Sequence, residues 1–65
     1  MVERTLGVLI AELEKQVGSR TEALASGHIK DYAEYRELVG LIRGLKLAIS
    51  ETRDLLRNFE DQEDE

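Results

Sequence analysis

Apolar residues recur along the second half of the chain at alternating spacings of three and four positions. The series runs through residues 35–59 without a proline. Its mean spacing of about 3.5 residues is typical of a helix whose apolar seam packs against another helix. The seam positions are Tyr35, Leu38, Ile42, Leu45, Ile49, Thr52, Leu56 and Phe59.

A shorter series of the same kind lies in the first half of the chain and predicts a helix over residues 3–25. Arg20 interrupts this series with a charge. A polar seam residue can fix the register of two helices at a cost in stability, or it can extend its head group into water. The seam positions of this first predicted helix are Leu6, Ile10, Leu13, Val17, Arg20 and Leu24.

Signals that end one helix and begin the next lie between the two series. Gly27 can adopt the left-handed backbone conformation that closes a helix. Asp31 can accept a hydrogen bond from the backbone N–H of Glu34, whose side chain can reach back as in a capping box. We therefore expect an all-α fold, a two-helix antiparallel hairpin of residues 3–25 and 31–60 that oligomerises into a helical bundle. One continuous helix is the competing topology.

The apolar stripe of the second predicted helix is wider than a two-position seam. Leu41, Ala48 and Leu55 add a third row beside it, which is the width typical of a bundle. The chain has 65 residues and no Cys, and small domains without disulfides commonly gain stability by oligomerising. We expect a homo-oligomer, for which a four-helix bundle of two hairpins is the simplest closed form.

The first predicted helix is shorter than the second. Leu55, Leu56 and Phe59 are therefore expected to project beyond it as an interface, unless they pack back onto Val2 and Leu6.

Gly40 and Gly44 lie in the middle of the second predicted helix, two turns and one turn before Ala48, respectively. Each Gly costs about 1 kcal/mol relative to Ala in a helix interior. This ridge either admits another backbone closely, from the hairpin or from a second subunit, or is a tolerated weakness that bends the helix. The predicted helix-packing and oligomer interface comprises Tyr35, Leu38, Gly40, Leu41, Ile42, Gly44, Leu45, Ala48, Ile49, Leu55, Leu56 and Phe59.

The net charge of −5 is concentrated at the end of the chain. Residues 1–59 hold nine acidic and nine basic residues, whereas residues 60–65 hold five acids and no base. We expect residues 1–59 to form the hairpin and residues 60–65 to be a solvated acidic tail. The alternative is an interaction tail that docks on a basic surface. The longest apolar run, residues 8–11, is far short of the ~20 residues that span a bilayer, so no membrane partner is expected.

The sequence offers little for catalysis or metal binding, and we expect no enzyme and no cofactor. His28 has Ser26 and Asp31 nearby in sequence, but a short loop has no shell to hold a catalytic set. A basic stripe on the second predicted helix could follow a phosphate backbone. It can equally be solvated or pair with acids such as Glu14, so nucleic acid is not expected. The stripe consists of Arg36, Arg43, Lys46, Arg53 and Arg57.

One segment, residues 31–45, carries an aromatic-x-x-Tyr-Arg-x-Leu-x-Gly-x-Ile-x-Gly-Leu core. It resembles very short helical-hairpin proteins of tailed bacteriophages. The resemblance implies a non-enzymatic phage structural or assembly protein that docks on larger head or head–tail proteins, in the virion or the host cytoplasm. Two alternatives stay open: a phage-encoded regulator that inhibits a host protein, and a nucleic-acid binder. The matching residues are Tyr32, Tyr35, Arg36, Leu38, Gly40, Ile42, Gly44 and Leu45.

Overall fold

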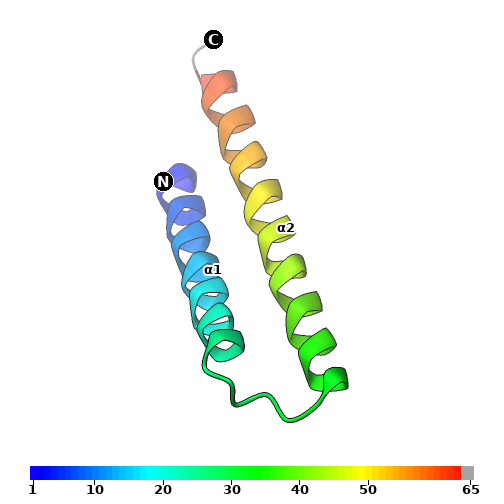
Figure 1. The fold of residues 1–65 in the computed structure, drawn as a ribbon. Coiled ribbons are helices and arrows are strands. Elements are labelled where there is room, and N and C mark those ends of the chain that lie inside the picture. Colours follow the sequence, from blue (N-terminus) through cyan, green and yellow to red (C-terminus); the bar gives the residue numbers. More distant parts are fainter. Residues whose placement is uncertain (64–65) are drawn as a thin grey trace.

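Two helices that pack side by side make up the fold in the computed structural model, which describes residues 1–63 (Figure 1). Helix α1 is Val2–Ala25, and helix α2 is Tyr32–Glu63. The chain reverses direction between them, so the helices are antiparallel and form a rod 52 Å long. The predicted all-α hairpin is therefore confirmed, and the single continuous helix is excluded.

The helix boundaries differ slightly from the predicted ones. Helix α2 begins one residue later than predicted and continues to Glu63, so residues 60–63 of the predicted tail are helical. The change in charge after Phe59 does not end the helix, because Glu is itself a good helix former. Asp64 and Glu65, the last residues of the predicted tail, lie outside the described residues.

The connection between the helices has the backbone geometry and the hydrogen bonds that its residues predict. Gly27 has a φ of 77°, in the left-handed region. Asp31 Oδ1 accepts a hydrogen bond from the backbone N–H of Glu34 at 2.8 Å, and Glu34 Oε2 accepts one from the backbone N–H of Lys30 at 3.2 Å. The return bond reaches one residue further back than in a standard capping box, but it still satisfies a free donor at the start of the helix.

The core between the helices is small. Three side chains are buried among the described residues, Ile10, Ile42 and Ile49, each with 7–9% of its surface exposed. The other predicted seam positions surround these three at intermediate exposure, with the exception of Tyr35, which is exposed. The two predicted seams therefore face each other, and α1 covers the seam of α2.

The two polar residues in the seams are satisfied within their own helices. Arg20 donates to the side chain of Gln16, one turn earlier on α1. Thr52 Oγ1 donates to the carbonyl oxygen of Ala48 at 2.7 Å. Neither residue forms a hydrogen bond between the helices. The register of α1 against α2 is therefore determined by apolar contacts and by one ion pair, which is described below. Neither α1 nor α2 has a described stretch that is long and apolar enough to cross a membrane.

Candidate helix-packing surface

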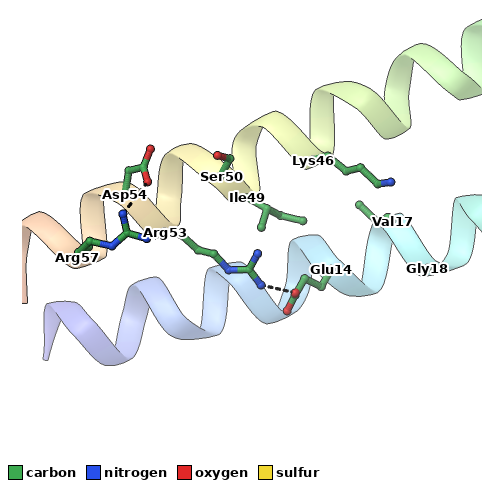
Figure 2. A pocket seen from close by; sticks show the side chains of 9 residues that line it. All are labelled: Glu14, Val17, Gly18, Lys46, Ile49, Ser50, Arg53, Asp54 and Arg57. Atoms are coloured by element: carbon green, nitrogen blue, oxygen red, sulfur yellow. Dashed lines mark hydrogen bonds and ion pairs between the residues drawn. The ribbon is translucent and has the colours of Figure 1, made fainter.

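One flank of the hairpin is polar and carries an ion pair that joins the helices (Figure 2). Arg53 Nη2 of α2 lies 2.6 Å from Glu14 Oε2 of α1. Both side chains are about half exposed, and an ion pair of this kind contributes about 0–1 kcal/mol. We call this side the polar flank; a shallow groove on it is lined by Glu14, Val17, Gly18, Lys46, Ile49, Ser50, Arg53, Asp54 and Arg57.

Charged groups in the polar flank pair with each other. Arg57 Nη1 lies 3.7 Å from Asp54 Oδ1, one turn earlier on α2. Between the helices, Ile49 and Val17 form the apolar floor of the groove (Figure 2). Two members of the predicted basic stripe, Arg53 and Arg57, are therefore used in ion pairs. For Arg53 the acidic partner is Glu14, one of the residues expected to pair with it.

The other flank of the hairpin is apolar. On a helix with 3.6 residues per turn, Leu41, Ala48 and Leu55 lie on the opposite side of the seam from Lys46 and Arg53. On α1, Val2 and Leu9 lie on the opposite side of the seam from Glu14.

These two rows lie on the same side of the hairpin. Helices α1 and α2 run antiparallel, and Glu14 meets Arg53 on one side of the seam. The rows that lie away from this ion pair must therefore meet on the other side. We call this surface the apolar flank: Val2, Leu9, Leu41, Ala48 and Leu55. The four larger side chains each keep 44–57% of their surface exposed.

The structure divides the predicted interface residues into an inner and an outer group. The inner group faces α1 and is buried or partly buried: Leu38, Ile42, Leu45, Ile49, Leu56 and Phe59. Ala48, with intermediate exposure, lies at the edge between this group and the apolar flank. The outer group remains exposed: Tyr35, Gly40, Leu41, Gly44 and Leu55. Of the three residues expected to project beyond α1, Leu55 is well exposed, whereas Leu56 and Phe59 have intermediate exposure. That these three residues form an interface beyond α1 stays a prediction.

The glycine ridge of α2 does not receive α1. A Cβ atom built on Gly40 or Gly44 would meet nothing within 4 Å. The possibility that the ridge admits the partner helix of the same hairpin is therefore wrong. Close approach of a second subunit and simple tolerance of the glycines both stay as predictions.

Sequence reasoning missed the contribution of α1 to the apolar flank. Val2 and Leu9 were not among the predicted interface residues, although they lie one heptad apart and beside the seam of α1. That heptad spacing was the available signal.

The remaining candidate groups are exposed. His28 Nδ1 lies 3.0 Å from Ser26 Oγ in the connection. Tyr32 and Tyr35 stack with their ring centroids 6.1 Å apart at the start of α2. The described part of the chain holds no group of three His, Cys, Asp or Glu side chains that could bind a metal ion.

Comparisons of this chain with protein-family models, with curated proteins and with solved structures found no match.

Proposed function

We propose that this chain is a small, non-enzymatic assembly protein that self-associates and docks on larger proteins. The observation that carries the proposal is the contrast between the core and the apolar flank. Among the described residues three side chains are buried, while four large apolar side chains remain about half exposed on one flank. Exposed apolar side chains that gather on one side of a small protein often mark an interface.

The small core supports the same proposal, because a hairpin with few buried side chains gains stability when a partner binds it. Chains of this length bury only about 60% of the surface that their unfolded state exposes, and their stability is marginal. Among the described residues of this chain, three side chains are buried. A partner that binds only the folded hairpin would shift the equilibrium toward the folded state.

A tailed-bacteriophage virion is the setting that we propose, at the head or the head–tail connection. The support is the resemblance of residues 31–45 to short phage hairpin proteins. Leu38, Ile42 and Leu45 of that segment belong to the inner group that faces α1. Gly40 belongs to the outer group, so part of the shared pattern is free for contacts outside the hairpin.

Mass spectrometry of particles purified from a phage that encodes this chain would test the proposal. We expect the chain to remain with the particles through density-gradient purification, at a constant ratio to the major head protein. A phage carrying Leu41→Asp should lose the chain from its particles, and one carrying Leu47→Asp should retain it. Leu47 is the matched control because it is 62% exposed and lies outside the apolar flank.

Absence of the wild-type chain from purified particles, despite its presence in infected cells, would contradict the virion role. The regulator of a host protein would then be the better interpretation, and affinity capture from host lysate should return one dominant host protein.

A further inference from the structure

The hairpin leaves an unusually large surface open for its mass. The chain exposes 5270 Å². A compact monomer of 7.4 kDa is expected to expose about 4,200 Å². The excess of about 1,100 Å² is comparable with the ~800 Å² that each partner contributes to a standard protein interface. The excess is spread over the whole rod, so it leaves room for a dimer interface without locating it.

The apolar flank is where such a partner would pack with most gain. Along α2 it carries Ala48 with Leu41 seven residues before and Leu55 seven residues after. Gly44 lies one turn before Ala48, and a Cβ atom there would meet nothing within 4 Å. A small centre between two large side chains suits the crossing point of two helices, because the backbones can approach there while the leucines pack on either side.

We propose that the occupant of the apolar flank is a second copy of this chain, related to the first by a two-fold axis near Ala48. The two α2 helices cross antiparallel at Ala48, and Leu41 of each copy packs near Leu55 of the other. This inference rests on the self-association in the proposed function. It adds the face that is used, the orientation of the two copies and the position of the axis.

Self-complementarity and charge support this arrangement. A two-fold interface uses the same patch on both subunits. Leu41 lies seven residues before Ala48, and Leu55 lies seven residues after it. In the antiparallel arrangement, Leu41 of one copy therefore lies beside Leu55 of the other. In a parallel pair, residues 60–63 of both copies, each with three acids and no base, would lie together at the negative ends of two helix dipoles. The antiparallel pair places these acidic ends at opposite ends of the dimer.

Disulfide trapping tests the arrangement directly, because the chain has no cysteine of its own. Ala48→Cys lies at the proposed axis and should cross-link to itself under mild oxidation. Leu47→Cys, on the outer face of α2, and Ser50→Cys, on the polar flank, are the controls. We expect Ala48→Cys to cross-link on the order of a hundredfold faster than either control. Paired thiols in a dimer have millimolar effective concentration, whereas the controls meet only by diffusion.

The orientation is tested with an equimolar mixture of Leu41→Cys and Leu55→Cys. Antiparallel packing predicts mixed 41–55 disulfides well above the statistical proportion, identified by mass spectrometry of the tryptic peptides. Far-UV circular dichroism checks that each variant remains helical. The mixture experiment uses no change at Ala48, so it stays informative if Ala48→Cys does not fold.

Three outcomes would overturn the inference: 41–41 and 55–55 disulfides without the mixed species, equal trapping by Ser50→Cys and Ala48→Cys, and a monomer at all concentrations in sedimentation equilibrium. The particle experiment is independent of these results. Trapping at Ala48 in a chain that is absent from particles would refute the proposed virion role and leave the dimer standing. A chain that is monomeric in solution but present in particles would refute the dimer and leave the virion role standing.

Discussion

Shortening Leu41 to Ala should weaken the association of two copies, whereas the same change at Leu47 should leave it unchanged. The two residues lie on the same helix and undergo the same chemical change. They differ in their position around the helix: Leu41 belongs to the apolar flank, and Leu47 lies on the outer face, with 45% and 62% of their surface exposed, respectively.

The expected magnitude follows from the exposed fraction of Leu41. Burying a whole Leu side chain contributes about 1.5–3 kcal/mol. Leu41 has 45% of its surface exposed in the hairpin. Covering this exposed part by the second copy therefore contributes about 1 kcal/mol per copy. The change occurs twice in a two-fold dimer, so Leu41→Ala should cost about 2 kcal/mol, or about 30-fold in Kd. Leu47→Ala should alter Kd less than about twofold, because Leu and Ala have similar helix propensities.

Sedimentation equilibrium over a wide concentration range measures both dissociation constants. Leu41 is also partly covered within the hairpin, so thermal unfolding followed by circular dichroism, well below the dimer Kd, is needed to measure the effect on the monomer separately. Equal changes in Kd for the two variants would refute the assignment of the apolar flank. An unchanged Kd for Leu41→Ala would refute it as well.

Three further changes test the fold itself. Ile49→Asp places a charge at a position with 7% exposure and should abolish both helicity and assembly, because an unpaired charge would enter the seam; a variant that stays helical and assembled would show that the seam is wrongly assigned. Asp31→Ala removes the acceptor of the 2.8 Å bond from Glu34 N–H and should cost about 1 kcal/mol, or about 4–8 °C in Tm for a domain of this size; Asp31→Asn should retain most of that stability, and equal Tm values for the two variants would contradict the cap. Gly40→Ala should raise Tm by a similar amount, because the added methyl meets nothing within 4 Å, whereas Gly27→Ala should lower it, because φ is 77° there; a fall in Tm for both would mean that Gly40 is needed.

The sequence by itself determined the elements of this protein. The two helices, the cap at Asp31 and the closing glycine depend on residues within four positions of each other, so they can be read from local spacing. The end of α2 cannot, because the helix continues to Glu63 without a change in spacing. The same holds for the seam. Ile42 and Ile49 lie at its centre by period alone, and they are among the three buried residues of the described chain.

The tertiary structure alone decided how the wide stripe is shared. Periodicity fixes the angle of Leu41, Ile42 and Lys46 around α2, but it does not fix the direction from which α1 approaches. In the structure, α1 packs over Ile42 and Ile49, with Glu14 against Arg53. The side of the seam that carries this ion pair becomes the polar flank. Leu41 and Leu55 are left on the opposite side, on the open apolar flank with Val2 and Leu9. The glycine ridge likewise turns out to face away from α1. A local repeat contains no information about which of two adjacent faces its neighbour will cover, because that choice depends on contacts between residues far apart in the chain.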